Sequence, residues 1–599
     1  MKGDIIPFYR ARLAAEKGAV RKDWGGKLSV ALTYPNAYRL GMSNLGFQIV
    51  YDLLNRRRDV VAERVFLPEG HEMSLYLRSG RALLSLETQT PLHKFGLVAF
   101  SLSFENDYPN ILKILELGKI PLFSGERDAL LPLVMAGGVT TFLNPEPLAS
   151  FVDFFLLGEA EANLNEFMDF FLEVIKQCED KGDALETLAR SISGLYVPSL
   201  YRPEYNKDGT LRSFFPIRGK IPEKVKVPRH MSPDREVAFS RITTPEAEFS
   251  DKILIELGRG CGRSCRFCAA GYVYRPPRIH EGSSLTASIE KALQGCSQLG
   301  LLGAAVSDIP EIERLTSQIV EQGRGFSVSS LRADSLSLEL LEDLKKAGQR
   351  SLAIAPEAGS DRLRKVINKR LTTEQIADAA QLVSRIGDFS LRLYFLIGLP
   401  TETREDIKKI VDLVKVIQHR MVKESAPRGR IGQIRLSINC FVPKPFTPFQ
   451  WCAMEEVSSL KEKQKWLRRA LVKEGGIKVN ADLPKWAFIQ TMISLGDRRV
   501  GSILFNCHKS GGDWTKALRC SDVNPEFFVY RPRGLDELLP WDFIDHGILK
   551  GHLKSEYSHS LKGEETEVCR VGECYRCGVC TRTQGQESPA IYNPDDIKN

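Results

Sequence analysis

The sequence predicts an α/β protein built from two strand–helix domains and a cysteine-rich tail. Strand-like apolar runs alternate with amphipathic helical stretches between residues 25 and 175, and again between residues 251 and 450. Alternation at this cadence predicts parallel sheets with right-handed crossovers. At 599 residues, the chain is too long for one hydrophobic core. Seven of its thirteen cysteines stand in two tight clusters, a spacing typical of metal ligands.

These patterns divide the chain into four segments. Residues 1–180 are expected to form a doubly wound, Rossmann-like domain, and residues 248–455 a partial (βα)6 barrel of the TIM type. Residues 181–247 are interpreted as a linker, with a hairpin signal at Asn206–Gly209. Residues 456–599 form a mixed C-terminal extension that carries the second cysteine cluster.

Five strands are predicted in the first domain. They correspond to the runs KLSVALTYP, VVAERVFLP, GLVAFSLS, PLVMAGGV and VDFFLLGEAEA. Ligands of doubly wound domains bind at the carboxyl ends of the strands, where this chain has small and polar residues.

Six strands are predicted in the second domain. They lie in KILIEL, LLGAAVSD, FSVSSLRAD, SLAIAPEAGS, SLRLYFLIGLP and QIRLSINCFVPKPFTPF. Thr373 is expected to cap a helix that runs to Ile386. Sites in such barrels occupy the carboxyl ends of the strands, which is where the first cysteine cluster follows KILIEL.

Composition excludes several classes of protein. No run of eighteen apolar residues exists to span a membrane, and the first twenty residues lack a signal-peptide pattern. We therefore expect no membrane insertion. Clustered cysteines favour a reducing compartment, so we expect a cytoplasmic protein. A net charge of +8 is compatible with an anionic partner such as RNA but does not require one.

The first cysteine cluster has the spacing C-x3-C-x2-C, with Cys261, Cys265 and Cys268 in LGRGCGRSCRFCAAG. Three thiolates on one loop can hold three irons of a cubane cluster and leave the fourth iron open to a substrate. The alternatives are half of a zinc site or three unrelated cysteines. Three arginines in the same stretch are expected to offset the anionic charge of a cluster: Arg259, Arg263 and Arg266.

The string CGRSCRFC resembles the signature loop of the radical S-adenosylmethionine (SAM) superfamily. The resemblance implies a 4Fe-4S cluster whose open iron binds SAM, and a reductant such as flavodoxin or ferredoxin. It also implies SAM contacts from the loop and from successive strand ends, although VSDIPE stands where the family commonly has a glycine-rich motif. The residues concerned are Phe267, Ser307, Asp308, Ser330, Arg332, Glu357, Ser360, Arg392 and Gly398. For each polar residue the alternative is a helix cap.

The combination AGG…NPEPLASFVDFFLLGEAEA resembles the cobalamin-binding domain that precedes many radical SAM cores. The resemblance implies a cobalamin site at the strand ends of the first domain. Its candidate residues are Gly41, Ser101, Ser103, Glu105, Gly137, Gly138, Gly158 and Glu159. No Asp-x-His-x-x-Gly motif is present, so neither His71 nor His93 is expected to bind cobalt. The alternative is a domain that keeps the fold but binds substrate or nothing.

The second cluster, CRVGECYRCGVC, has the spacing C-x4-C-x2-C-x2-C. Four thiolates close a tetrahedral site, which predicts a second iron–sulfur cluster or a zinc ion. The ligands would be Cys569, Cys574, Cys577 and Cys580. The preceding LLPWDFIDHGILKGHL resembles the tail of an uncharacterised cobalamin-binding radical SAM subfamily.

Three functions are compatible with these features. The first is a radical SAM enzyme that performs cobalamin-dependent methylation or rearrangement of an unidentified substrate. The second is sulfur insertion on RNA or protein, because CFVPKPFTPFQW resembles the closing strand of radical SAM proteins that include the methylthiotransferases. Lys444 in this stretch is expected to be a solvated lysine. Against sulfur insertion, the first domain has no cysteine before Cys178 to hold an auxiliary cluster. The third is a non-catalytic, RNA-associated iron–sulfur module.

Overall fold

The first domain contains a six-stranded sheet with the order β2-β1-β3-β4-β5-β6. The computed structural model describes residues 4–231 and 237–580. The strands are β1 (Leu28–Tyr34), β2 (Val60–Phe66), β3 (Leu97–Ser101), β4 (Leu133–Gly137), β5 (Phe154–Leu156) and β6 (Leu195–Tyr196). The first five are parallel, and β6 pairs antiparallel with β5. This order is that of a flavodoxin-like doubly wound sheet, so the predicted fold class of this domain is confirmed.

Both faces of this sheet are covered, which is why all seven residues of β1 and all seven of β2 are buried. The covering helices include α3 (Leu45–Arg56), α5 (Tyr108–Leu117) and α7 (Ala160–Gln177). Helix α3 begins where the Asn44 side chain accepts a hydrogen bond from the backbone of Phe47, a standard N-cap.

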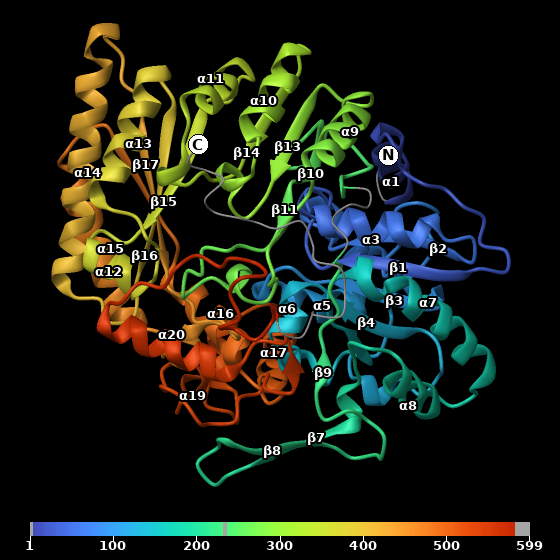
Figure 1. Cartoon of the computed structure of the whole chain (residues 1–599). Coiled ribbons are helices and arrows are strands. Elements are labelled where there is room, and N and C mark those ends of the chain that lie inside the picture. Colours follow the sequence, from blue (N-terminus) through green and yellow to red (C-terminus); the bar gives the residue numbers. More distant parts are fainter. Residues whose placement is uncertain (1–3, 232–236, 581–599) are drawn as a thin grey trace.

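The second domain contains seven parallel strands in two groups (Figure 1). The first group is β10 (Lys252–Glu256), β13 (Gln298–Leu302) and β14 (Gly325–Val328). The second is β15 (Ser351–Glu357), β16 (Ser390–Ile397), β17 (Ile434–Cys440) and β18 (Ile477–Ala481). One parallel bridge, Leu331 to Ile354, joins the groups. The six predicted strands of an open, partial barrel are confirmed. Strand β18 is a seventh that lies beyond residue 455 and was not predicted.

Helices cover the outer side of these strands in Figure 1. They are α9 (Gly282–Leu293), α10 (Ile312–Glu321), α11 (Leu338–Lys346), α13 (Thr373–Ile386), α14 (Arg404–Ser425) and α15 (Val457–Val472). The predicted cap Thr373 is wrong by one residue, because Thr372 caps α13 in a capping box with Gln375. Alternate residues of β16 are buried towards these helices, so Arg392 and Tyr394 face the inner side of the sheet.

The segment interpreted as a linker is ordered and partly integrated into both neighbours. Helix α8 (Lys181–Ser191) packs on α7. The predicted hairpin is confirmed as β7 (Tyr201–Tyr205) and β8 (Leu211–Pro216), and it projects from the body in Figure 1. Its turn requires a left-handed residue, which Gly209 supplies with a φ of 86°. Strand β9 (Val225–Lys226) pairs with β19 (Ile544–Asp545) of the extension.

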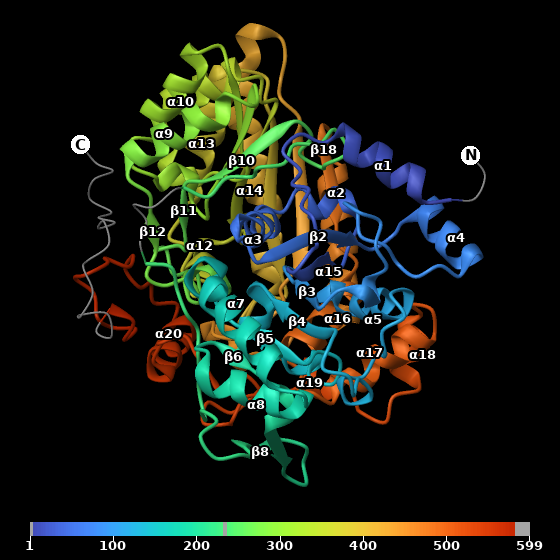
Figure 2. The ribbon, with the colours of Figure 1, turned by 90° about the vertical axis from the view of Figure 1, so that its right-hand side faces the viewer.

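The C-terminal extension packs against both domains (Figure 2). Its helices are α16 (Pro484–Leu495), α17 (Val500–Lys509), α18 (Trp514–Arg519), α19 (Glu526–Val529) and α20 (Lys550–Lys562). Helix α17 contacts α5 of the first domain, and α20 contacts α12 (Asp361–Val366) of the second. The Asn144 amide donates to the carbonyls of Ser494 and Gly496, which binds the first domain to the C-terminal end of α16. In the part of the chain that the structure describes, no helix has the length and apolar content needed to cross a bilayer.

Candidate functional site

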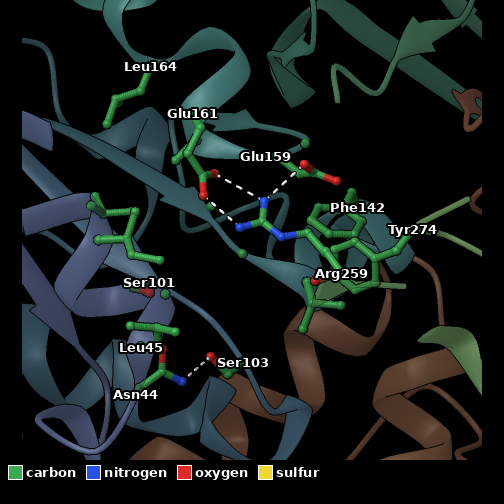
Figure 3. Close-up of a pocket in the computed structure, with 18 of the residues that line it drawn as sticks. Asn44, Leu45, Ser101, Ser103, Phe142, Glu159, Glu161, Leu164, Arg259 and Tyr274 are labelled. Atoms are coloured by element: carbon green, nitrogen blue, oxygen red, sulfur yellow. Dashed lines mark hydrogen bonds and ion pairs between the residues drawn. The ribbon is translucent and has the colours of Figure 1, made fainter. Parts of the chain in front are cut away.

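A cavity of about 450 Å³ lies between the strand ends of the first domain and the chain leading into the cysteine loop (Figure 3). One wall contains Ser101 and Gly137, at the carboxyl ends of β3 and β4. The opposite wall contains Gly260 and Tyr274, on either side of the three loop cysteines. Most of the remaining lining is apolar, which suits a ligand with a large hydrophobic surface. A ligand in this cavity would therefore touch both domains.

Six of the eight residues predicted to contact cobalamin line this cavity. They are Ser101, Ser103, Gly137, Gly138, Gly158 and Glu159. Gly41 does not, because it packs inside the domain, where a Cβ would lie 2.5 Å from the Phe66 ring. Glu105 does not either. It is buried, and it forms an ion pair with Lys444 and accepts a hydrogen bond from Gln490 at 2.9 Å.

The Glu105 pair corrects the prediction that Lys444 is solvated. Lys444 reaches from the stretch after β17 to a carboxylate of the first domain, and its side chain is 18% exposed. Burial would raise the pKa of Glu105, but the charge of Lys444 and the hydrogen bonds from Lys444 and Gln490 together hold this pKa below its usual value. The pair therefore fixes the relative position of the two domains.

Two of the cavity glycines are required by the backbone. Gly138 has a φ of 113°, and a Cβ there would lie 2.3 Å from the Leu102 carbonyl oxygen. Gly158 has a φ of 105°, and a Cβ would lie 2.5 Å from the Pro228 carbonyl oxygen. Both glycines allow close passage of neighbouring chain segments at the strand ends. Their presence alone is therefore no sign of a ligand.

Glu159 and Glu161 connect the cavity wall to the cysteine loop. The Arg259 guanidinium donates to Glu159 at 2.9 Å and to Glu161 at 2.6 Å, and Figure 3 shows it between the two carboxylates. Arg278 donates to the other oxygen of Glu159 at 2.6 Å. Burial would raise the pKa of Glu161, yet the Arg259 charge lowers it. Glu161 was missed in the sequence, although it lies two residues after Glu159 in the same GEAEA string.

The loop arginines bind carboxylates in three different parts of the molecule. Arg259 binds the first domain, as described above. Arg263 binds Asp308 through two hydrogen bonds of 2.7 Å, which secures the loop to the 3-10 turn Val306–Asp308 that follows β13. Arg266 is fully buried and binds Glu556 of α20 at 3.1 Å. These ion pairs show that the three arginines hold the loop in place, and their predicted effect on the charge of a cluster stays a prediction.

The three loop thiols have the environment of metal ligands. Burial raises the pKa of Cys268 to about 12, and the negative charges of Cys265 and Cys261 add to the shift. Burial and then Cys265 raise the pKa of Cys261. Each thiol therefore lies within electrostatic reach of the others, and an all-sulfur set suits iron–sulfur clusters or zinc. Among the described residues no three His, Cys, Asp or Glu side chains already adopt metal-site geometry, so the donor set and its burial carry this assignment.

Three of the residues predicted to bind SAM gather beside this loop, each with a partner. Asp308 holds Arg263. The Ser307 hydroxyl accepts from the Arg332 backbone at 3.2 Å. The Arg332 guanidinium binds Asp334 at 2.9 Å. It also lies near Cys265, whose negative charge is one of the causes that raise the pKa of Arg332.

Glu357 lies at the end of β15 in a strained conformation. Its φ is 65°, a region that costs a non-glycine residue about 1–3 kcal/mol. Its carboxylate contributes to the raised pKa of Cys268, and Lys369 binds it at 3.3 Å. Strain maintained beside the loop is typical of a functional position.

The remaining predicted SAM residues have other surroundings. Ser360 caps α12, accepting from the Leu363 backbone at 3.1 Å. Phe267 packs in a small apolar cluster with Leu363 and Phe441. Gly398 has a φ of 78° and donates its N–H to Glu402 at 2.9 Å. Ser330 and Arg392 line a second cavity, of about 820 Å³, on the inner side of the strands.

The four tail cysteines lie directly against the loop. The Cys569 backbone donates to the Gly262 carbonyl at 2.8 Å. Arg275 donates to the Ser264 hydroxyl at 2.6 Å, and the negative charges of Cys577 and Cys569 help to raise its pKa. Burial raises the pKa of Cys569 to about 12, with contributions from the other three tail thiols. None of the four forms a disulfide with another described cysteine, as a metal site requires. The sequence did not indicate that the two cysteine clusters are neighbours.

Comparison with known protein families gave two matches. The model described as "Radical SAM superfamily" matches residues 255–414. The model described as "Radical SAM proteins, N-terminal" matches residues 46–198.

Comparison with curated proteins gave matches that differ in their extent. "Uncharacterized protein MJ0966" of Methanocaldococcus jannaschii is 30% identical over 479 residues, which are 80% of this chain and 90% of that protein. A tRNA-2-methylthio-N(6)-dimethylallyladenosine synthase of Thermosipho melanesiensis is 25% identical over 189 residues, 29% of this chain and 44% of that protein.

Among solved structures, TsrM from Kitasatospora setae with tryptophan substrate and a SAM analogue aligns with a TM-score of 0.43 and 15% identity. The alignment covers 68% of this chain and 72% of TsrM. The cobalamin-dependent enzyme OxsB with aqua-cobalamin aligns with a TM-score of 0.44 and 14% identity, over 80% of this chain and 66% of OxsB.

Proposed function

Because the chain belongs to the radical SAM superfamily, we propose that Cys261, Cys265 and Cys268 hold a 4Fe-4S cluster with an open iron for SAM. When bound and reduced, such a cluster supplies the electron that splits SAM into methionine and a 5′-deoxyadenosyl radical. The observation that supports this assignment is an all-thiol donor set on one short, partly buried loop that follows a parallel strand. A low-potential donor such as flavodoxin or ferredoxin would supply the electron.

Residues of the chain would hold the loop and exclude water from it. Arg263 and Arg266 secure it to the turn after β13 and to α20 through carboxylates that are themselves buried. Asp308, Ser307 and Arg332 would orient SAM from the strand ends. Glu357, strained and close to Cys268, would do so from β15.

We further propose that the enzyme is a cobalamin-dependent methyltransferase. Bound cobalamin supplies a transferable methyl group. Support comes from the 450 Å³ cavity, where a flat ligand against Ser101 and Gly137 would face Gly260 and Tyr274 of the loop segment. The described lining residues include no histidine, so a cobalamin there would have no imidazole ligand from this wall.

Anaerobic reconstitution tests the first proposal. With iron, sulfide, dithionite and SAM, the protein is expected to release 5′-deoxyadenosine, whereas Cys265→Ala is expected to release none. Absence of 5′-deoxyadenosine from a protein whose cluster is verified by spectroscopy would contradict the proposal.

A cavity-filling variant tests the second proposal. Ser101→Trp would occupy the strand-end wall, so the cobalamin absorption of protein prepared with the cofactor is expected to disappear. Ser458→Trp, at an exposed position of α15, is the matched control and is expected to keep it. Equal absorption in both variants would argue against a cofactor in this cavity.

A second candidate function is sulfur insertion, which the contact between the tail cysteines and the loop favours. We propose that the tail holds a second cluster or a zinc ion. A cluster in the tail would lie beside the cysteine loop, where a sulfur-inserting enzyme needs its auxiliary source of sulfur. The chain spans less than half of the methylthio synthase relative, so this activity is the weaker proposal. Mass analysis of products formed with labelled SAM distinguishes a transferred methyl from a methylthio group. Release of 5′-deoxyadenosine with no modified product in cell extract would leave both candidates without support.

A further inference from the structure

Three cations lie side by side on the inner side of the partial barrel. The register pairs Arg392 of β16 with Arg435 of β17, and Arg435 with Lys478 of β18. Paired residues of neighbouring parallel strands point to the same face, about 4.8 Å apart in the backbone. We call these three residues the basic row.

The basic row is not neutralised within the described chain. Arg392 and Lys478 are exposed and have no hydrogen-bond or ion-pair partner there, while Arg435 donates only to the Gln433 side chain, at 2.8 Å. Like charges directly opposite each other destabilise a sheet. A row of positive charges without negatively charged partners is expected at a site where a bound anion neutralises them.

Positively charged side chains also line the cavity beside the basic row. Arg392 lines the 820 Å³ cavity together with Lys252 and Arg350. One carboxylate, Glu357, also lines it, and that group is bound to Lys369. The volume lies in the range of small-molecule sites, about 300–1,000 Å³. Tyr394 is the next inward-facing residue of β16 towards the loop end and adds a partly apolar surface.

We propose that the basic row binds the phosphate or diphosphate group of a small organic substrate. The proposal rests on the proposed function, since it assigns the substrate class of that same site. Arg392 is the third residue of β16, and the strand ends at Ile397. The five steps between them span about 16 Å at 3.3 Å per residue. A substrate anchored by its phosphate at the row would extend past Tyr394, with its other end at Glu357 and the cysteine loop.

Arg392 is thereby assigned to the substrate, whereas the sequence predicted a SAM contact. Its place near the start of β16 separates it from Gly398, which directly follows the strand. Arginine suits the new role, because its planar guanidinium binds phosphate through two hydrogen bonds.

Equilibrium binding to the purified full-length protein tests the proposal. Inorganic pyrophosphate and ADP are expected to bind saturably, and the affinity is expected to fall as salt rises. Arg435→Gln and Lys478→Gln are expected to weaken binding by about tenfold or more, since each removes a charged donor. Arg519→Gln, an exposed residue of α18, is the matched control and is expected to bind normally. No saturable pyrophosphate binding, or an equal loss in Arg519→Gln, would overturn the proposal.

Two further measurements separate a ligand site from other roles. Without ligand, Arg435→Gln is expected to raise the melting temperature, because it relieves repulsion within the row. A lower melting temperature would indicate a structural arginine and would contradict the inference. Binding of single-stranded RNA with no binding of pyrophosphate or ADP would likewise overturn it. Release of 5′-deoxyadenosine by the unmodified protein is measured in parallel, so failure of the radical chemistry and failure of phosphate binding are distinguishable.

Discussion

Arg266 of the cysteine loop and Glu556 of α20 form a buried ion pair, with 3.1 Å between Nε and Oε2. The guanidinium is completely buried and also donates to the carbonyls of Lys365 and Val366. Thr566 donates its hydroxyl to the same Glu556 carboxylate at 2.9 Å. The pair therefore joins the loop to the helix that precedes the tail cysteines.

Loss of this pair is expected to destabilise the protein strongly. Glu556→Gln would leave a buried guanidinium without its counter-charge, at a cost of about 3–5 kcal/mol in the free energy of unfolding. Urea unfolding of the variant and of the unmodified protein measures this difference in the free energy of unfolding. Glu405→Gln, which breaks the exposed pair with Lys408, is the control and is expected to change stability by less than about 1 kcal/mol. Similar losses in the two variants would show that the buried pair has no special role.

The tail cysteines are expected to bind metal independently of the loop. Cys574→Ala removes one tail ligand and leaves the loop thiols unchanged. If the tail holds a cluster, iron per chain is expected to fall by about four atoms, because a 4Fe-4S cluster is lost. If it holds zinc, zinc falls and iron stays constant. Elemental analysis distinguishes these outcomes, and unchanged iron and zinc would exclude a tail metal site.

Two substitutions at Glu357 are expected to separate the cost of its strained backbone from the contribution of its carboxylate to SAM binding. Glycine adopts a φ of 65° without penalty, so Glu357→Gly is expected to be more stable than Glu357→Ala by about 1 kcal/mol. Both variants lose the carboxylate, so both are expected to show weaker SAM binding than the unmodified protein. Thermal unfolding and SAM titration test the pair. Tight SAM binding by both variants would remove Glu357 from the site.

Asp107 is expected to make stability depend on pH. Burial raises its pKa to about 6, against a hydrogen bond from Asn36 at 2.8 Å that lowers it. An acid whose pKa is raised on folding binds more protons in the folded state, so stability falls as pH rises from about 4 to about 6. The loss is at most about 3 kcal/mol. The variant Asp107→Asn has no carboxyl group at this position, so its stability lacks this contribution to the pH dependence.

Urea unfolding of the two proteins at each pH tests this prediction. The difference between them is expected to change across the window from pH 4 to pH 6 and to be constant above it. A constant difference throughout would show that Asp107 titrates as it does in water.

The periodicity of the sequence was sufficient to predict five strands of the first domain and six of the second. Alternation of apolar and polar residues and continuous apolar runs are local signals, because the polarity of each residue indicates whether it faces the core or the solvent. The strand β18 was missed although apolar and polar residues alternate in IKVNA, because it has only five residues and none of them is fully buried. Spacing likewise determined both cysteine clusters, because the ligands of each stand within twelve residues or fewer.

The partners of those residues were decided only by the tertiary structure. Lys444 meets Glu105 across 339 positions of sequence, and Arg266 meets Glu556 across 290. Likewise, Arg392, Arg435 and Lys478 become neighbours only through the register of three strands. Register and domain packing depend on hydrogen bonds and burial distributed over the whole sheet, and no local pattern encodes them. The sequence by itself therefore determined which thiols are grouped as candidate cluster ligands, and the fold determined what surrounds them.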